Sequence, residues 1–327
     1  MEFARSHIRH ARRAVTQSVH AELVAVLVAV TQGQPRVLTI QGGSLLPAGP
    51  FEAEHRSLQM GLRAWVEAQT HHPLGYVEQL YTFADRDRAY ADGARIVSIS
   101  YLALTREPEG DDPSGSADSQ AGWQDWYRYF PWEDWREGAP AVIEAHVVPA
   151  LQGWAHQVEG ERAQRRWQRA AAAFGLDGSD WNEDLVLQRY ELMFEAGLVP
   201  EAVRRHGPAL HAPLAGLGAP MAHDHRRILA TGIARLRAKI KYRPVVFELM
   251  PPAFTLLQLQ QTVQALAGRV LHKQNFRRLI EQQDLVEETG ALTQAGAGRP
   301  AKLFRFRRDV MLERALAGSK LPLARGG

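Results

Sequence analysis

The chain has 327 residues, of which 45% are apolar and 23% charged, so it has the composition of a folded protein and the length for two domains with separate cores. It contains no cysteine, which excludes disulfide bonds, thiolate zinc sites and cysteine nucleophiles. It also contains no apolar run close to the roughly 18 residues that a membrane helix requires. The net charge of +3 is too small to identify a nucleic-acid partner by itself. Absence of cysteine fits a reducing compartment, and we expect a cytoplasmic protein without a membrane partner.

The first residues, MEFARSHIRHARRAV, are rich in arginine and poor in acid. This composition fits a transit peptide, a basic arm that touches phosphates, or a solvated lead-in to the first strand. We favour the solvated lead-in, because chain termini usually behave in this way.

The front half alternates extended and helical patterns. Residues 22–30 read ELVAVLVAV, a Val-rich apolar run that is typical of a buried strand. A turn at Gly33-Gln34-Pro35 follows, and a glycine-rich loop precedes a helix with apolar residues on one face. We predict strands over residues 22–30, 36–40, 76–83 and 96–104, and a helix over residues 55–69.

Two unusual segments come next. Residues 107–120 are acidic and rich in Gly, Pro and Ser, which predicts a mobile insertion. Residues 123–135 hold seven aromatic side chains. We interpret them as a core edge or a subunit contact rather than as an aromatic cage for a ligand.

From about Val142 onward the pattern is helical. Apolar residues at spacings of three and four predict helices over residues 161–174, 183–196 and 223–241. The triplet His223-Asp224-His225 has the residue types of a metal site, but it stands where a helix begins, and there Asp224 would cap amides and complement the helix dipole. We therefore predict no metal ligand in this triplet.

The segment from Gly49 to His71 resembles the Nudix box, the loop-helix-loop of hydrolases that split nucleoside diphosphates linked to another group. Gly49, Arg63, the apolar Trp65 and Glu67 stand at box positions with the family's spacing. The remaining box positions depart from the pattern: the three other glutamates are replaced by His55, Ala64 and Ala68, and the closing glycine is replaced by Thr70.

The missing carboxylates are the chemically important ones. Acids at helical spacings of three and four present oxygens on one helix face, where they hold Mg²⁺ against a pyrophosphate. The metal offsets the charge that builds up on the diphosphate and on the attacking water. One remaining glutamate supplies too few oxygens, so we predict no catalytic residue and no metal site.

A Nudix-like fold without its metal still offers a cleft between sheet and helix. Guanidinium groups bind phosphates in bidentate fashion, which makes several arginines candidates for contacting a nucleotide. The alternative for each arginine is an ion pair that holds the fold, for instance Arg63 with Glu67 one helical turn away. The predicted ligand-binding residues are Arg36, Arg63, Glu67, Arg86 and Arg88.

The C-terminal part has the order of a winged helix-turn-helix. Thr255 is a suitable N-cap for a helix that buries Leu256, Leu259, Val263 and Leu266 and ends at Gly268. A second helix begins near His272 and is expected to bury Phe276, Leu279 and Ile280. A hairpin over residues 285–306 then forms the wing. Between residues 255 and 314 the sequence has ten basic and six acidic residues.

The polar face of the second helix carries residue types that contact DNA bases and phosphates in other proteins. Arg and Lys donate to guanine, Asn and Gln pair with adenine, and all four contact phosphates. A solvated basic face is the alternative for the helix alone, but the succession of helix, helix and basic wing favours DNA binding. The predicted DNA-binding residues are Thr255, Lys273, Gln274, Asn275, Arg277, Arg278, Arg299 and Lys302.

Both halves together are similar to the Nudix-related transcriptional regulators of NAD metabolism, the NrtR- and NadQ-type repressors. Three phrases carry the resemblance: RLRAKIKYRPVVFELMPPAFTLLQLQ (235–260), HKQNFRRLI (272–280) and GRPAKLFRF (298–306). The resemblance implies a homodimer that binds a palindromic double-stranded DNA operator upstream of genes for NAD synthesis or salvage. It also implies a Nudix-like domain that senses NAD, ADP-ribose or ATP, with no cofactor required. The insertion and the helical middle favour the longer NadQ-like branch.

The expected architecture is an α+β chain with a Nudix-like α/β sandwich, a helical linker and a winged helix domain. Its expected boundaries are residues 1–155, with the insertion at 107–120, then 156–222, 223–315 and a tail at 316–327. Two other functions remain open. A divergent hydrolase would use carboxylates outside the box, such as Glu78 or Asp85, and a non-specific nucleic-acid binder would not distinguish between DNA sequences.

Overall fold

The computed structural model of the protein describes residues 19–84, 95–107, 120–202, 216–293 and 300–307. The predicted insertion, apart from Glu107 and Gln120, and the basic N-terminal segment lie outside these ranges. In the described part of the chain a six-stranded mixed sheet has the order β4-β5-β1-β2-β6, with β3 paired to β1. β1 and β5 are parallel, and the other pairs are antiparallel. The strands are β1 (Val19–Thr31), β2 (Gln34–Thr39), β3 (Ala48–Pro50), β4 (Tyr76–Phe83), β5 (Arg95–Leu104) and β6 (Gly122–Asp125).

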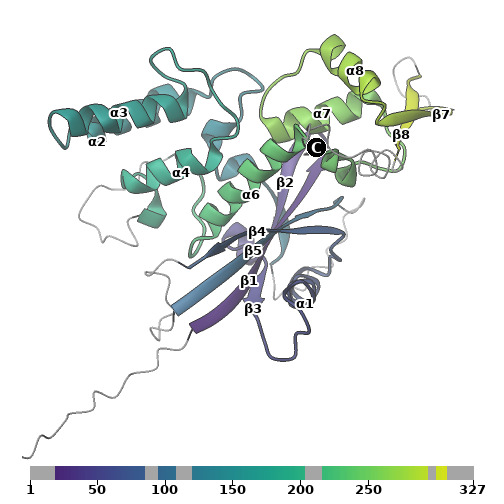
Figure 1. Ribbon diagram of the computed structural model, residues 1–327, viewed down its shortest axis with the longest axis horizontal. Helices are drawn as coiled ribbons and strands as arrows, with labels where there is room; N and C mark the ends of the chain where they lie inside the picture. Colours follow the sequence, from purple (N-terminus) through teal and green to yellow (C-terminus); the bar gives the residue numbers. More distant parts are fainter. Residues whose placement is uncertain (1–18, 85–94, 108–119, 203–215, 294–299, 308–327) are drawn as a thin grey trace, which may run out of the picture.

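The Val-rich run forms β1 because both of its faces are covered. Residues 23–29 of this strand are 0% exposed. On one face, α1 (Leu58–Thr70) packs Leu62 and Val66 against the sheet. On the other face lies α6 (His225–Ile240), which approaches so closely that a Cβ on Gly232 would lie 2.8 Å from Val26. Figure 1 shows α1 and α6 on opposite sides of the sheet. α6 therefore covers the front domain, although its sequence adjoins the winged helix.

The helical middle is part of the same body. It consists of a π-helical turn (Ile143–Val147), α2 (Val148–Ala155), α3 (Glu161–Phe174) and α4 (Val186–Glu195). These elements share one hydrophobic core with the sheet and with α6. The aromatic segment forms the centre of this core, since Trp126, Tyr129, Phe130 and Trp132 are all 0% exposed. The segment is thus part of the core, as predicted, but it lies at the centre of the core and not at its edge.

The C-terminal elements form a winged helix, which lies beside α6 in Figure 1. α7 begins at the predicted N-cap, Thr255, with a reciprocal capping box to Gln258, and ends at Gly268 in the left-handed region (φ 69°). The wing strand β8 also exchanges backbone hydrogen bonds between Phe304 and Phe254, of 2.8 and 2.9 Å, which attach the wing to the segment before α7. The elements are α7 (Leu256–Ala267), α8 (Lys273–Gln282), β7 (Val286–Leu292) and β8 (Lys302–Phe306), preceded by a 3₁₀ turn, η5 (Val245–Leu249).

Three local predictions need correction. Leu279 of α8 is 51% exposed rather than buried, because it stands at the mouth of a pocket described below. Of the four α7 residues predicted to be buried, Leu259 and Leu266 are fully buried, whereas Leu256 and Val263 are half-buried. Asp224 occupies the N-cap position of α6, but its side chain makes no capping hydrogen bond. Within the described residues, no helix is long and apolar enough to cross a membrane.

Candidate DNA-binding and ligand-binding sites

α8 presents a polar face because its two buried residues stand one helical turn apart. Phe276 and Ile280 are each 8% exposed and pack towards α7. Apart from Leu279, the rest of the helix surface is formed by polar residues. The predicted DNA-contacting residues of this helix, Lys273, Gln274, Asn275, Arg277 and Arg278, are all exposed.

The basic groups of α8 differ from those of the wing in their partners. In the part of the chain that the structure describes, Lys273, Arg277 and Arg278 form no ion pair. In the wing, by contrast, Lys302 contacts Glu288 at 2.8 Å and Arg305 contacts the β7 carboxylate opposite it at 2.6 Å. Exposed pairs of this kind contribute little stability, so Lys302 remains accessible to a phosphate. Within the described residues, the Lys273, Arg277 and Arg278 side chains also make no hydrogen bond, so their donors are available for phosphates or bases.

Thr255 and Arg299 differ from the other predicted DNA contacts. Thr255 is 9% exposed, and its hydroxyl oxygen accepts the 3.1 Å hydrogen bond from the Gln258 amide that caps α7. It has little surface to offer a phosphate, and we leave it out of the proposed interface. Arg299 lies outside the described residues.

The box positions of α1 hold an aromatic cluster in place of carboxylates. His55 stacks on Phe51 with ring centroids 5.8 Å apart and meets the edge of Trp65 at 6.4 Å. The Trp65 indole covers Gly49 so closely that a Cβ there would lie 2.2 Å from the ring. Trp65 Nε1 also donates a 2.8 Å hydrogen bond to the Pro50 carbonyl. The glycine at the start of the box is thus required for packing.

These residues do not fit a magnesium ion. Glu67 is exposed on α1, and the box positions His55, Ala64 and Ala68 supply no carboxylate oxygens beside it. Within the described residues, no group of three or more His, Cys, Asp or Glu side chains is arranged to hold a metal ion. A hard cation needs several oxygen ligands, so we derive no metal-dependent step for this domain.

The two described arginines of the predicted ligand-binding set, Arg63 and Arg36, contact backbone carbonyls. Arg63 donates to the carbonyls of Leu74 and Gly75, the latter at 3.0 Å, and so ties α1 to the loop that follows it. From the sequence, the alternative to ligand binding for Arg63 is an ion pair with Glu67. The structure shows these carbonyls as partners instead, but the role is the same, because Arg63 stabilises the fold. Arg36 donates at 2.8 Å to the carbonyl of Trp123 on β6.

The remaining predicted ligand contacts are not brought together by the described part of the structure. Glu67 lies on the exposed side of α1. Arg86 and Arg88 fall outside the described residues, as does Asp85, one of the two carboxylates considered for a divergent hydrolase. The ligand-binding set therefore remains a prediction.

Glu78, the other carboxylate considered for a hydrolase, faces away from α1. Along β4 it alternates with Val77, which packs on the α1 side of the sheet, and shares the α6 side with Leu80. Lys239 of α6 forms a salt bridge with its carboxylate, and Tyr76 donates a 2.8 Å hydrogen bond to it. Glu78 is thus engaged on the far side of the sheet from the Nudix-like helix.

The structure also shows a connection that the sequence did not suggest. Carbonyls at the end of a helix lack partners within that helix, and at the end of α7 they receive donors from outside the winged helix. We call the four contributing residues, Tyr127, Glu133, Trp135 and Arg237, the α7 latch. The bonds run from Tyr127 Oη to Ala265 O (2.7 Å), from Arg237 Nε to Leu266 O (2.9 Å) and from the Trp135 amide to Gly268 O (2.7 Å).

Two of the latch residues, Glu133 and Arg237, are both buried and charged. Glu133 is 1% exposed, and its carboxylate lies between Arg189 of α4 and Arg237 of α6, at distances of 2.6 Å from each guanidinium. Burial raises the pKa of Tyr127, so its hydroxyl retains the proton that it donates to α7. The Glu133 carboxylate thus joins the aromatic segment to α4 and α6, and Arg237 extends this connection to the end of α7. No short-range sequence signal links these residues, because their contacts are purely tertiary.

Comparisons with known proteins agree with this architecture. Residues 246–306 match the sequence model of the NrtR DNA-binding winged helix domain. The ADPR responsive transcriptional repressor NtrR of Acinetobacter baylyi (strain ATCC 33305 / BD413 / ADP1) is 42% identical over 86 residues, which cover 26% of this chain and 34% of that protein. The match thus spans about a third of the curated relative's length.

Two solved structures share the fold over most of the chain. Shewanella oneidensis NrtR complexed with a 27mer DNA has a TM-score of 0.53 at 20% identity, covering 89% of this chain and 94% of that one. A second structure of Shewanella oneidensis NrtR has a TM-score of 0.52 at 21% identity, covering 89% of this chain and 95% of that one. The chain therefore shares the fold of Shewanella oneidensis NrtR over most of its length. Its C-terminal domain is an NrtR-type DNA-binding winged helix domain.

Proposed function

We propose that this protein is a DNA-binding transcriptional regulator, and specifically a repressor of genes for NAD synthesis or salvage, whose Nudix-like domain senses ADP-ribose or a related adenine nucleotide. The uncommitted basic face of α8 is the observation that carries the DNA-binding part. The name of the Acinetobacter relative supports ADP-ribose ahead of NAD and ATP. The proposed interface consists of Lys273, Gln274, Asn275, Arg277, Arg278, Arg299 and Lys302.

The proposed assembly is a homodimer on a palindromic operator. A single α8 reads only a few base pairs, and two copies related by a twofold axis would read two half-sites about one helical turn apart. Nucleotide binding and operator binding would then be linked through the shape of each protomer. A ligand that binds better to one arrangement of the two domains changes operator affinity by that difference, and the effect is reciprocal.

The α7 latch is the proposed route of this coupling. Its donors belong to the segment after β6 and to α6, both of which contact the Nudix-like sheet, and its acceptors belong to α7. A shift of the sheet relative to α6 would therefore move or release the end of α7. Because α8 packs on α7, the reading helix would follow.

We further propose that the Nudix-like domain is catalytically silent. Support comes from the aromatic cluster at the box positions and from the orientation of Glu78 away from α1. The matching assay is incubation with ADP-ribose and Mg²⁺, in which turnover should not exceed that in buffer. Turnover well above buffer would favour a divergent hydrolase.

The test of the regulator is an equilibrium binding experiment. DNA from the gene's own upstream region and a scrambled duplex of equal length are titrated at matched salt, with and without ADP-ribose, NAD or ATP. We expect the upstream DNA to bind about a thousandfold tighter or more, because specific sites usually exceed non-specific ones by that factor. ADP-ribose should change the affinity more than NAD or ATP. Equal affinity for both duplexes would indicate a non-specific binder.

A further inference from the structure

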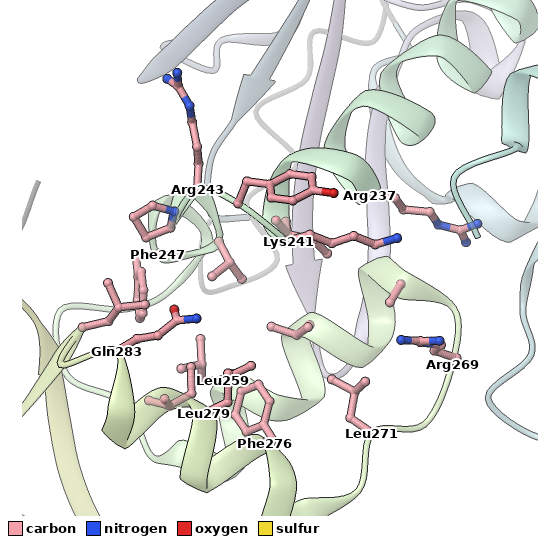
Figure 2. A pocket seen from close by; sticks show the side chains of 18 of the residues that line it. Arg237, Lys241, Arg243, Phe247, Leu259, Arg269, Leu271, Phe276, Leu279 and Gln283 are labelled. Carbon is pink, nitrogen blue, oxygen red and sulfur yellow. The ribbon is translucent and has the colours of Figure 1, made fainter. Parts of the chain in front are cut away.

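A pocket separates the end of α6 from the winged helix. It has a volume of about 250 Å³ and lies between residues 240–247, which lead from α6 into η5, and the facing sides of α7 and α8. Figure 2 shows Leu259, Phe276 and Leu279 on one side of this space and Lys241 across from them. The pocket is separate from the Nudix-like sheet and α1, where the nucleotide is expected.

The floor of the pocket is apolar. Leu259 and Val263 come from α7, and Phe276 and Ile280 come from α8. Leu279 adds a large apolar side chain at the mouth that is 51% exposed, on a helix whose other exposed residues are polar. Small-molecule sites have this character, with a mostly apolar lining and a few polar groups that fix orientation. At roughly 10–15 Å³ per water-sized group, the space suits a ligand of on the order of 15 to 25 non-hydrogen atoms or fewer.

The rim of the pocket is cationic. Lys241 lies 3.0 Å from Glu183 and 2.9 Å from Asp184, so its ammonium group is already paired. Arg269 lies 3.8 Å from Glu183, too far for a hydrogen bond, and its side chain is 53% exposed. Arg269 therefore has donors to offer. Figure 2 shows Lys241 and Arg269 on the same side of the cavity, whereas Arg243 is directed away from it.

The carboxylate in the rim remains ionised. Burial raises the pKa of Glu183, but hydrogen bonds from its own backbone and from Lys241, together with the charge of Arg269, outweigh burial and hold this pKa below its usual value. An anion entering the pocket would be attracted by Arg269 and repelled by the Glu183 carboxylate 3.8 Å from it, so it would bind on the side of the guanidinium that faces away from Glu183. A cationic ligand would have to compete with Lys241 for Glu183 and Asp184.

We propose that this pocket is a second ligand site, which binds a small amphipathic anion: a flat apolar body in the pocket and one carboxylate, sulfonate or phosphate group at Arg269. The site goes beyond the proposed nucleotide sensing and would act on the same winged helix. Its walls come from the end of α6 and from both helices of the winged helix, and Arg237 of the α7 latch lines it. Occupancy thus biases the angle between α6 and α8, and with it operator affinity.

The experiment uses a matched pair of probes on the full chain without DNA. Binding of 1-naphthoate and of its neutral analogue 1-naphthalenemethanol is measured by isothermal titration calorimetry. We expect one saturable naphthoate site per chain, with the alcohol about tenfold weaker because it lacks a charge-assisted bond to Arg269. Arg269→Ala should remove this preference by weakening naphthoate alone. Val263→Phe should fill the floor and abolish binding of both probes.

Two control variants make the result specific. Arg165→Ala removes an equal charge from the exposed Arg165–Glu161 pair on α3, and Val270→Phe adds the same bulk at an exposed position of the winged helix outside the pocket. Both should bind naphthoate like the parent. Circular dichroism reports whether each variant is folded. If Val263→Phe fails to fold, the Arg269→Ala result decides.

Three outcomes would overturn the proposal: no saturable naphthoate binding by the parent, equal binding of both probes, or an unchanged preference in Arg269→Ala. Because the calorimetry is done without DNA, it measures probe binding to the pocket even if the proposed operator binding fails. A final titration of naphthoate into the protein–operator complex tests regulation, and unchanged operator affinity at saturating naphthoate would remove the regulatory part.

Discussion

Arg237 Nη1 lies 2.6 Å from Glu133 Oε2, and both side chains are withdrawn from solvent at 0% and 1% exposure. The two residues are 104 positions apart in the sequence. Arg189 shares the same carboxylate, so two guanidinium groups depend on one buried negative charge. The same Arg237 donates to the Leu266 carbonyl at the end of α7. Glu133 therefore contributes both to the buried core and, through Arg237, to the contact between α6 and the end of α7.

Glu133→Gln should destabilise the protein strongly. Removal of one partner from a buried ion pair costs about 3–5 kcal/mol, because the remaining charge is left without compensation, and here two arginines are affected. The measurement is urea denaturation followed by circular dichroism. Glu161→Gln serves as the control, since that side chain is 83% exposed and should change stability by about 0.5 kcal/mol or less. A loss below about 1 kcal/mol in Glu133→Gln would show that the latch carboxylate is dispensable for the fold.

Gly268→Ala tests the close approach at the end of α7. Gly268 has a φ of 69°, and a Cβ there would lie 2.4 Å from the Glu133 carbonyl and 2.9 Å from the Tyr127 hydroxyl. Gly33 has a similar φ of 73° with no described atom within 4 Å, so Gly33→Ala isolates the backbone cost. We expect Gly33→Ala to cost about 1–2 kcal/mol. Gly268→Ala should cost about 1–3 kcal/mol more, because the clash forces the latch apart. Equal losses of stability in thermal or urea denaturation would mean that the latch residues can move away from the added Cβ at little cost in free energy.

Local signals explain what the sequence could predict. The Thr255–Gln258 capping box and the helix end at Gly268 follow from side chains within a few residues of each terminus. α3 was predicted to cover residues 161–174 and has these bounds, because its apolar spacing and the glycine at each end are local features. The exposed α8 face follows from the spacing of Phe276 and Ile280.

Tertiary contacts explain what the sequence could not predict. Leu279 shares the helical spacing of Phe276 and Ile280, and only the position of the segment after α6 decides that it faces a pocket mouth. The latch joins residues 127 and 265 and residues 133 and 237, and no periodicity or motif relates such distant positions. Arg63 matches the Nudix box in sequence, but its guanidinium is taken by the carbonyls of the following loop, which a motif does not reveal.

Arg277→Ala and Arg278→Ala should each weaken operator binding without affecting stability, since both side chains are exposed on α8. A contact to a base edge is worth about 1–3 kcal/mol and would relax specificity at one position. A contact to a phosphate would instead lower the salt slope of the binding constant by about 1. Fluorescence anisotropy at several salt concentrations separates these cases.

The control for these variants is Arg165→Ala, which removes a positive charge from α3, away from the proposed interface. It should bind the operator like the parent. Both α8 variants should also bind ADP-ribose like the parent, because the expected nucleotide site is in the other domain. Parent-like operator binding by both variants would remove α8 as the reading helix.

Tyr127→Phe should reduce the coupling between ADP-ribose and operator. The change removes one donor from the latch, the 2.7 Å bond to the Ala265 carbonyl, and preserves the packing of the ring. Each ligand should still bind the variant alone. Mutations along a coupled network change coupling by about 0.5–2 kcal/mol, so the ratio of operator affinities with and without ADP-ribose should move towards one by a corresponding factor.

Tyr129→Phe is the matched control for this prediction. Its hydroxyl is buried in the same aromatic segment and donates a 2.7 Å hydrogen bond to the Gly43 carbonyl, a contact that does not involve α7. Both variants leave one buried carbonyl without that donor and should lose similar stability, about 1–3 kcal/mol. Only Tyr127→Phe should lose coupling. An equal loss of coupling in both would mean that the effect comes from general destabilisation, and an unchanged coupling in Tyr127→Phe would exclude this bond as part of the connection between the domains.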